Sequence, residues 1–471
     1  MNKSIKLTAL FTLLLTLILL VNLTIIQAFS TQKYAEHPRN PRGFYDMQTV
    51  ARGQIFAGGT VLAQSTADDK GIYSRSYPVN SPAWGPVTGY LSDRYGAAQL
   101  EASYNSVLNG TADSLATRNF WKHLAGEPTP GANVEVTIDP QLQQRAYDLL
   151  AEQAYEGAAV ALQPSTGKIL AMASSPSYNP GTIDSQWDAL QVEPGSPLLN
   201  HATQETLPPG SIFKIITTAA GLENGYGPQS ELTGAPEITL PGTNTQLTNY
   251  GGQTCAGSPV VTLTTAFALS CNTAFVEMGT NVGADALRAT AEAFGVGTTY
   301  DLGVDAAPGA LGTLEDSAAV GQSAIGQRDV SMSALQAAVM AATVANEGKR
   351  MEPYLVNRIT DTTMNDISTT RPREAAQAIS PDVAAMVTDM MFASERNTYG
   401  YNGNGYASKT GTAEHGNGLP PHVWYVAFDP NRDIAVAVVV KDGGHLGTGA
   451  TGGQVSSPIG RALLDAYTGE K

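Results

Sequence analysis

An apolar segment near the N-terminus is the feature that most limits how this chain of 471 residues can fold. The twenty residues from Leu7 to Ile26 are apolar except for four threonines and one asparagine. As a helix, a segment of this length extends about 30 Å, which matches the hydrocarbon thickness of a bilayer. The segment therefore predicts a single membrane-spanning helix, with one or more folded units following it.

The charges around this segment predict its orientation. Lys3 and Lys6 precede it, and it contains no acidic residue. Because basic residues favour the cytoplasmic side, we expect a short cytoplasmic N-terminus and an extracytoplasmic remainder, anchored in the cell membrane. A cleaved signal peptide is the alternative, but its apolar region is normally shorter and ends in a small-x-small site, which residues 26–28 match poorly.

Length and charge exclude some classes of protein. A chain this long exceeds one ordinary core, so we expect two folded units after the anchor. A hydrophobic content of 42% favours globular packing over disorder. The formal net charge of −15 argues against nucleic acid as a partner, because phosphate contacts require clustered lysine and arginine.

Export also changes the interpretation of the two cysteines, Cys255 and Cys271. Outside the reducing cytosol this pair can form a disulfide, and closing its loop would stabilise the fold by about 3 kcal/mol. Two free, buried thiols are the alternative. A zinc site is not expected here, because the pair lacks histidines at metal-binding spacing.

The distribution of turns and periodic segments divides the chain. Short alternating runs separated by glycine and proline follow a polar linker, and they predict a small mixed or β-rich module. An Asp139-Pro140 pair then begins a helical pattern. The expected units are an anchor (1–29), a linker (30–44), an N-terminal non-catalytic module (45–138) and a catalytic domain (139–471).

Strand-like segments lie at both ends of the catalytic domain. Residues 157–163 and 168–174 flank a Pro-Ser-Thr-Gly turn, and residues 423–428 and 434–440 flank a second turn, so each pair predicts a β-hairpin. Helix-like segments lie between the hairpins, at 211–222, 263–278, 284–294, 333–346 and 381–394. This order predicts an α+β domain with an antiparallel sheet and segregated helices.

A Ser-x-x-Lys motif occurs three times, and its surroundings distinguish the copies. Residues three apart share a helix face, so the lysine can take the proton of the serine. Ser30 lies in the linker, and Ser165 lies in a hairpin turn. Only Ser211, with Lys214, starts a predicted helix, where a backbone N–H can also bind an oxyanion.

Two further motifs follow in order. Ser-x-Asn occurs at Ser103, Ser177 and Ser270, and Lys-Thr-Gly occurs once, at Lys409. The order Ser-x-x-Lys, Ser-x-Asn, Lys-Thr-Gly at domain-scale spacing is met by Ser211, Ser270 and Lys409. Each motif alone is weak evidence, but the ordered set is typical of β-lactamases and penicillin-binding proteins.

On these motifs the chain resembles the class B penicillin-binding proteins, and among them the short actinobacterial members. The resemblance covers nearly the whole chain. It is carried by Arg52-Gly-Gln-Ile, Thr88-Gly-Tyr, Ser211-Ile-Phe-Lys214, Ser270-Cys-Asn272, Gly326-Gln327 and Lys409-Thr-Gly-Thr-Ala-Glu-His415. It implies a penicillin-binding/serine β-lactamase-like transpeptidase domain, preceded by one transmembrane helix and a small mixed pedestal-like or dimerisation module.

The resemblance also implies the chemistry. Ser211 would attack the penultimate D-Ala carbonyl of a peptidoglycan stem peptide, D-Ala would leave, and the amine of a neighbouring stem would take the acyl group. Penicillin and other β-lactams would mimic D-Ala-D-Ala and trap the acyl-enzyme. No cofactor is implied. Partners in the divisome, or a glycosyltransferase, would bind the N-terminal module, and the favoured role is septal cell wall synthesis.

The family's residue roles carry over to matching positions. Lys214 would take the Ser211 proton, Ser270 with Lys409 would relay a proton to the leaving group, and Asn272 would position the substrate amide. The strand Thr410-Gly411-Thr412 would bind the substrate, with both threonine hydroxyls on its carboxylate. The backbone N–H groups of Ser211 and Thr412 would form the oxyanion hole. The resemblance leaves one departure, Cys271 in the middle of Ser-x-Asn; bonded to Cys255, it would fix the loop of Ser270.

Other conspicuous residues are given structural interpretations. The spacing of His415, His422 and His445 resembles no metal site, so we expect none there. Arg52 and Gly53 are expected to stabilise the junction of the N-terminal module.

Five alternative functions compete with the transpeptidase. A non-enzymatic penicillin sensor would act through a cytoplasmic partner, and the expected cytoplasmic tail of about six residues is too short for a signalling domain. A D,D-carboxypeptidase would use water as the acceptor, and a non-catalytic divisome scaffold would act through the N-terminal module. A bifunctional glycosyltransferase would need more residues between the anchor and the domain, and a β-lactamase would need a deacylating base, for which no candidate is evident.

Overall fold

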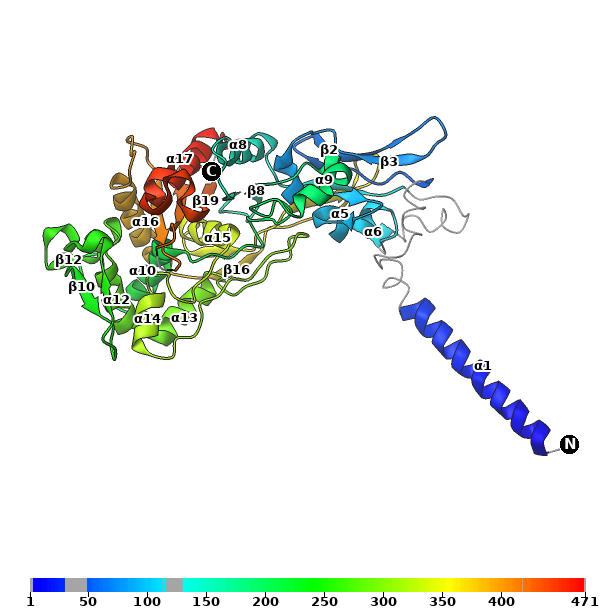
Figure 1. Ribbon diagram of the computed structural model, residues 1–471, viewed down its shortest axis with the longest axis horizontal. Coiled ribbons are helices and arrows are strands. Elements are labelled where there is room, and N and C mark those ends of the chain that lie inside the picture. Colours follow the sequence, from blue (N-terminus) through cyan, green and yellow to red (C-terminus); the bar gives the residue numbers. More distant parts are fainter. Residues whose placement is uncertain (1–2, 30–48, 113, 116–129, 417, 470–471) are drawn as a thin grey trace.

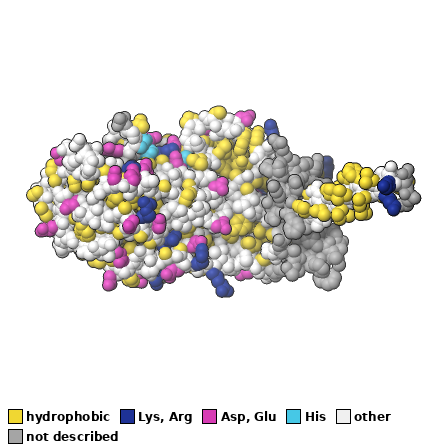
Figure 2. Space-filling model, turned by 90° about the horizontal axis from the view of Figure 1, so that it is seen from below, with side chains coloured by type: hydrophobic (Ala, Val, Ile, Leu, Met, Phe, Trp, Pro, Cys, Tyr) yellow, Lys and Arg dark blue, Asp and Glu magenta, His cyan; other side chains and the backbone are white. Residues whose placement is uncertain are grey.

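The computed structural model describes residues 3–29, 49–112, 114–115, 130–416 and 418–469. Helix α1 (Lys3–Phe29) contains the apolar N-terminal segment, and its span Lys3–Ile26 buries no side chain in the described chain. By length and composition α1 can cross a membrane, as predicted. Figure 1 shows it as a rod outside the folded body, and Figure 2 shows hydrophobic side chains along it with basic ones at one end.

An antiparallel sheet of five strands forms the centre of the catalytic half, in the order β17-β18-β19-β7-β8. The strands are β7 (Gly157–Leu162), β8 (Ile169–Ser175), β17 (Ala407–Ala413), β18 (His422–Asp429) and β19 (Ile434–Val440). Both predicted hairpins are present, as β7–β8 and β18–β19. Because β17 lies at the edge of this sheet, one side of it is not paired with another strand of the sheet.

Alternate residues of these strands face two hydrophobic layers, as the period of a strand requires. In β18, Tyr425 packs in the layer formed with α8 (Pro140–Ala151) and α17 (Gly452–Ala466), whereas Trp424 packs in the layer formed with α15 (Ala334–Ala345). Helices therefore cover both faces of the sheet (Figure 1). The predicted α+β fold is confirmed.

A further group of helices makes up the rest of the catalytic half and includes the segments with the Ser-x-x-Lys and Ser-x-Asn motifs. They are α10 (Lys214–Glu223), α11 (Leu263–Ala268), α12 (Asn272–Val282), α13 (Ala284–Ala293), α14 (Ser317–Ser323) and α16 (Pro381–Arg396). The single helix predicted over 263–278 is wrong: it ends at Ala268 and restarts at Asn272. The break contains Ser270, whose φ of +60° lies in the left-handed region and cannot continue a helix.

The N-terminal module is built on a mixed sheet in the order β15-β14-β6-β1-β2-β3. Its strands are β1 (Ile55–Ala57), β2 (Thr60–Ala67), β3 (Tyr73–Ser76), β6 (Asn133–Val136), β14 (Val356–Thr360) and β15 (Asp366–Thr369). Strands β14 and β15 come from the catalytic half of the sequence. The division at residue 138 stays a prediction, and this sheet contains strands from both sides of it.

Short elements complete the described chain. In the N-terminal module they are α4 (Gly85–Thr88), α5 (Gln99–Ser103), α6 (Asn105–Leu108), β4 (Leu91–Ser92) and β5 (Gly96–Ala97). Elsewhere they are α9 (Ile183–Leu190), β9 (Glu231–Thr233), β10 (Glu237–Thr239), β11 (Gln246–Thr248), β12 (Val260–Thr262), β13 (Lys349–Met351) and β16 (Glu374–Gln377).

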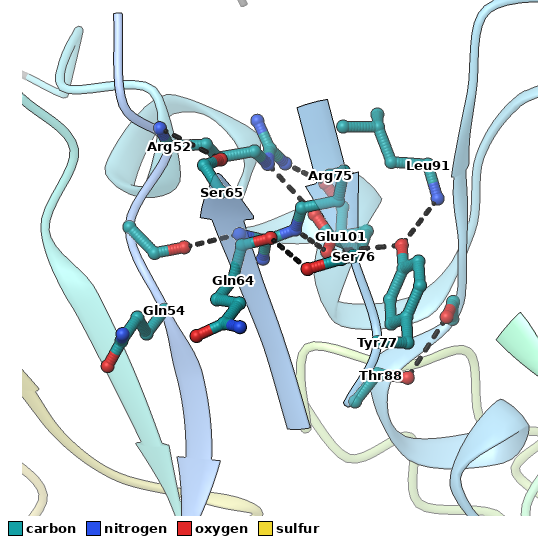
Figure 3. A network of polar contacts seen from close by, with 12 residues as sticks. Arg52, Gln54, Gln64, Ser65, Arg75, Ser76, Tyr77, Thr88, Leu91 and Glu101 are labelled. Carbon is teal, nitrogen blue, oxygen red and sulfur yellow. Dashed lines mark hydrogen bonds and ion pairs between the residues drawn. The ribbon is translucent and has the colours of Figure 1, made fainter. Parts of the chain in front are cut away.

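A buried charge cluster lies in the N-terminal module (Figure 3). The carboxylate of Glu101, with no solvent exposure, accepts hydrogen bonds from Arg52 Nε at 2.9 Å and from Arg75 Nε at 2.6 Å. Arg52 also donates to the Asn105 side chain, and Tyr77 donates to Glu101. Burial alone would raise the pKa of Glu101, but the charges of Arg75 and Arg52 outweigh it and hold that pKa below its ordinary value.

Gly53 follows the first arginine of this cluster for a steric reason. A Cβ at this position would lie 1.9 Å from the carbonyl oxygen of Ala132. The amide of Gly53 donates to the carbonyl of Leu108 at 2.7 Å. Only glycine allows the backbone to approach this closely, so Arg52-Gly53 joins the start of the module to its end.

Candidate active site

Ser211 lies in a tight turn directly before a buried helix. The 3₁₀ turn η3 (Gly210–Phe213) continues into α10, and the amide of Gly210 donates to the carbonyl of Gly326 at 2.9 Å. The prediction that the helix starts at Ser211 needs correction, because the first turn is wound more tightly, as is frequent at helix termini. Ser211 is partly exposed, whereas the residues from Lys214 to Leu222 are buried.

The turn that carries Ser211 packs directly on β17. The indole Nε1 of Trp424 donates to the carbonyl of Pro208 at 2.9 Å. A Cβ at Gly411 would lie 2.7 Å from the carbonyl oxygen of Pro209, and a Cβ at Gly210 would lie 3.0 Å from that of Thr412. Glycine at 411 therefore lets the strand approach the turn, and Ser211 and Thr412 lie on neighbouring segments.

Lys214 is fully buried and its ammonium group is held by the Ser-x-Asn loop. Its Nζ donates to the carbonyl of Ser270 at 2.7 Å and to Oδ1 of Asn272 at 2.8 Å, and it lies 3.2 Å from Oγ of Ser270. Burial, reinforced by the charge of Lys409, holds the pKa of Lys214 well below its ordinary value.

Lys409 approaches the same serine from the sheet. It lies in β17 and its Nζ donates to Oγ of Ser270 at 2.9 Å and to the carbonyl of Thr410 at 3.0 Å. Burial lowers the pKa of Lys409 to about 7. The hydroxyl of Ser270 therefore lies between two lysines that come from different parts of the chain.

The Ser-x-Asn loop is held in place by a covalent bond and by the start of α12. The predicted disulfide is present, and it joins Cys271 to Cys255 with a Cα–Cα distance of 5.8 Å. Asn272 donates through Nδ2 to the carbonyl of Thr248 at 3.0 Å, so its Oδ1 stays directed at Lys214. The left-handed backbone of Ser270 directs its hydroxyl toward the lysines instead of along a helix face.

Two aromatic rings that the sequence analysis did not single out face the lysines. Nζ of Lys214 lies 5.3 Å from the centroid of the Phe275 ring, and Nζ of Lys409 lies 5.8 Å from that of Phe267. Among the described residues, neither ammonium group is bonded to a carboxylate. The rings exclude water from both amines, and the attraction between each ammonium group and the ring quadrupole is weaker than an ion pair. Phe267 precedes Ser270 by three residues and Phe275 follows Asn272 by three. This spacing from the motif is the one feature of the sequence that could have pointed to the two rings.

A second buried network supports β17 from the opposite side of Lys409. The carboxylate of Glu395 accepts hydrogen bonds from Ser408, from the Tyr425 hydroxyl at 3.0 Å and from Arg461 Nε at 2.7 Å. Asn404 donates to the same group at 3.0 Å. These contacts fix the strand one residue before Lys409.

The other motif copies have structural partners or lie outside the description. Ser30 lies outside the described residues. Ser165 donates to Asp433, and Ser177 donates to the carbonyl of Pro82 at 2.9 Å. Ser103, in α5, donates to the carbonyl of Gln99 at 3.1 Å. Among the copies that the structure describes, only those at Ser211, Ser270 and Lys409 are brought together.

One acidic cluster near the sheet is occupied by a lysine. Glu156 and Glu205 both bind Nζ of Lys441, and Glu205 also contacts Nδ1 of His201 at 2.7 Å. Nε2 of His201 contacts the carbonyl of Gly195 at 2.8 Å. An ammonium group therefore already provides the positive charge that a metal ion would bring to this cluster.

Comparison with known families defines the class of protein. The penicillin binding protein transpeptidase domain matches residues 157–465, and the penicillin binding protein A dimerisation domain matches residues 52–134. The first match covers more than half of the chain, and it contains every motif of the site just described. The chain belongs to the penicillin-binding protein transpeptidases.

Individual relatives are similar over the full length. The peptidoglycan D,D-transpeptidase PbpA of Mycolicibacterium smegmatis is 45% identical over 99% of both chains, and PbpA of Mycobacterium tuberculosis is 43% identical over 99% of both. The ceftriaxone acyl-enzyme of penicillin-binding protein A from M. tuberculosis has a TM-score of 0.85 at 44% identity, over 90% of this chain and 99% of that one. The corresponding penicillin G acyl-enzyme has a TM-score of 0.82 at 44% identity, over 88% and 99%. The resemblance inferred from the motifs is confirmed.

Proposed function

We propose that this chain is a membrane-anchored serine D,D-transpeptidase of peptidoglycan synthesis, which acts through a Ser211 acyl-enzyme and is blocked by penicillin. The observation that carries the proposal is the Ser270 hydroxyl, which bridges Lys214 and Lys409 near the turn that carries Ser211. Relatives over the full length are named D,D-transpeptidases, and related structures are acyl-enzymes with β-lactams.

Lys214 is the base in acylation. Because burial and the charge of Lys409 hold its pKa well below the ordinary value, the amine gives up its proton more readily than an exposed lysine does. It lies at the start of α10, one turn after Ser211, and takes the hydroxyl proton as Oγ attacks the penultimate D-Ala carbonyl carbon. The backbone N–H groups of Ser211 and Thr412 stabilise the resulting oxyanion.

Ser270 returns a proton to the leaving group. When the tetrahedral intermediate collapses, the C–N bond breaks and the nitrogen of the departing D-Ala has to gain a proton. The hydroxyl of Ser270 lies 3.2 Å from Lys214 and 2.9 Å from Lys409, so it can give its proton to that nitrogen and regain one from a lysine. Asn272 keeps Lys214 in position and has its amide group near the substrate.

The edge of β17 holds the donor peptide. Thr410 and Thr412 are two residues apart and partly exposed, so both hydroxyls lie on one face of the strand, where the terminal carboxylate of the substrate binds. The positive charge of Lys409 adds to this attraction. The acyl group then passes to the amine of a neighbouring stem peptide, which forms the cross-link.

The anchor and the module define where this reaction takes place. Helix α1 holds the protein in the cell membrane with a short cytoplasmic N-terminus, and the catalytic domain lies outside, where peptidoglycan is assembled. The N-terminal module provides the surface for divisome or glycosyltransferase partners, and the enzyme acts in septum formation.

Labelling with a fluorescent penicillin tests the assignment. The wild type should become covalently labelled and the Ser211→Ala variant should not, and membranes with the wild type should produce dimeric cross-links from labelled stem peptides. Persistent labelling of Ser211→Ala would exclude Ser211 as nucleophile. Release of D-Ala without cross-links would identify a carboxypeptidase, and neither product would identify a non-catalytic scaffold.

A further inference from the structure

Two histidines and an aspartate converge at the end of β17, outside the machinery described above. Nε2 of His415 lies 2.9 Å from Oδ1 of Asp442, and Nδ1 of His422 lies 3.6 Å from the same oxygen. One ligand atom from each residue lies within 4.8 Å of the other two. The three residues come from the β17–β18 connection, the first position of β18 and the segment that follows β19.

The polar atoms of this cluster are poorly satisfied by one another. Nε2 of His415 is buried and has no hydrogen-bond partner among the described residues, although a carboxylate oxygen is close, because the oxygen does not lie in the direction of the ring nitrogen. Nδ1 of His422 accepts only a long hydrogen bond of 3.3 Å, from the amide of Asp442. A buried, unpaired nitrogen beside a carboxylate is costly unless another group binds both.

The spacing of these atoms fits a metal ion. Zinc binds imidazole nitrogen at about 2.0–2.1 Å and carboxylate oxygen at about 2.0–2.2 Å, which places neighbouring tetrahedral ligands about 3.3 Å apart. The two separations from Asp442 lie on either side of that value. Two imidazoles and one carboxylate are also a ligand set that suits divalent transition metals, whereas calcium and magnesium prefer oxygen ligands.

One rearrangement is required for binding. The two imidazole rings are stacked with centroids 3.8 Å apart and planes 10° from parallel, so their lone pairs cannot both point at one ion. His422 is buried, but the side chain of His415 is 27% exposed and lies on a connecting loop. Rotation of His415 out of the stack would direct both nitrogens at the ion.

We propose that His415, His422 and Asp442 form a binding site for one divalent transition-metal ion, of which Zn²⁺ is the best fit. The expectation of no metal site among these histidines rested on their spacing, which could not include Asp442. Three protein ligands leave a fourth position for water.

The position of this site gives the ion a consequence for the enzyme. His422 pairs with Ala413, the residue after Thr412, across β17 and β18. Asp442 belongs to the segment that joins β19 to α17, and its neighbour Lys441 is bound by Glu156 and Glu205. The ion would link the β17–β18 connection to the segment between β19 and α17, beside the strand proposed to bind substrate. Because the ion binds the folded state, it would raise the Tm of the protein.

Zinc binding by the full-length protein, purified in detergent without a polyhistidine tag and stripped with a chelator, tests the proposal. Isothermal titration with ZnCl₂ should give one ion per wild-type chain. The variants His415→Ala and Asp442→Ala should each lose at least about 10- to 100-fold in affinity, since removing a ligand costs no less than removing an outer partner. Both residues lie on connections, so these variants should fold.

His445→Ala is the matched control. His445 lies on the same segment as Asp442 but stacks on Tyr155, with ring centroids 5.2 Å apart, and is outside the cluster. This variant should bind Zn²⁺ like the wild type, and Zn²⁺ should raise the Tm of both. The proposal is overturned if the wild type binds no Zn²⁺, or if His415→Ala and Asp442→Ala bind it as tightly as His445→Ala does.

Discussion

Two groups of buried cations in the described residues differ in their counter-charge, one in the N-terminal module and one in the active site. In the N-terminal module, Arg52 and Arg75 surround the fully buried carboxylate of Glu101 (Figure 3). Five of their six guanidinium nitrogens donate hydrogen bonds. In the active site, Lys214 and Lys409 are equally buried but face a serine, an asparagine and two phenylalanine rings. Burial is the same in both groups, and the counter-charge is present in only one.

The choice of cation follows from this difference. An arginine keeps its charge when buried, so it requires a carboxylate and then acts as a rigid structural link. A lysine without a counter-charge instead releases its proton, which provides a base and a proton donor near neutral pH. The N-terminal module uses buried charge to connect its segments, and in the proposed mechanism the buried lysines of the active site transfer protons.

The largest effect should come from making the active site resemble the module. Lys214→Arg keeps a positive group at this position but removes a base that can be neutral, because arginine does not deprotonate in proteins. Acylation by penicillin should fall by about 10²- to 10⁴-fold, measured as the second-order rate of label incorporation. A rate within a few-fold of the wild type would show that Lys214 is not the base.

The next largest effect should come from removing the counter-charge of the module. Glu101→Gln leaves two buried arginines without a carboxylate and should destabilise the module by about 3–5 kcal/mol, measured by denaturant unfolding. Glu315→Gln, which breaks an exposed pair with Arg328, is the control and should change stability little. Equal losses of unfolding free energy in the two variants would mean that burial of Glu101 does not determine the size of the effect.

Removal of the disulfide should have an intermediate effect. Among the described residues no ion pair holds the Ser-x-Asn loop, and the bond between Cys255 and Cys271 fixes Ser270 in its place. Replacing both cysteines by serine should lower stability by about 3 kcal/mol and slow acylation. Unchanged unfolding and unchanged acylation in the variant, and in wild type with dithiothreitol, would contradict this role.

The smallest effect should come from removing an uncompensated cation. Lys409→Met should leave stability unchanged or raise it by about 1–4 kcal/mol while impairing acylation, the reverse of Glu101→Gln.

The pKa of Lys409 falls from 10.5 to about 7 on folding, so the folded state loses stability as the pH drops from 10.5 to 7. The advantage of the variant should therefore be larger at neutral pH than above the unfolded pKa. A free energy of unfolding lowered as far as in Glu101→Gln, measured in the same way, would contradict this difference.

The elements that local pattern determines were predictable from the sequence. The apolar run predicts α1, the turn between residues 162 and 169 predicts the β7–β8 hairpin, and the order of the motifs selects Ser211 among three candidate serines. Each of these signals lies within a few residues, or in an order that chance rarely produces.

The remaining features depend on contacts between distant segments. Helical periodicity continues through Ser270, and only its position between two lysines and beside a disulfide explains the left-handed turn there. Strands β14 and β15 join a sheet whose other members precede residue 137. Asp442 meets His415 only when β18 and β19 have paired. No spacing within one segment contains this information.

The pH dependence of Ser211 acylation tests the central claim most directly. With the wild type and a fluorescent penicillin, the second-order rate should form a bell. It should fall on the alkaline side as Lys409 loses its proton around pH 7, and on the acidic side as Lys214 gains one. A rate that keeps rising until the ordinary lysine pKa of about 10.4 would show that burial does not release the Lys214 proton, and would contradict the account.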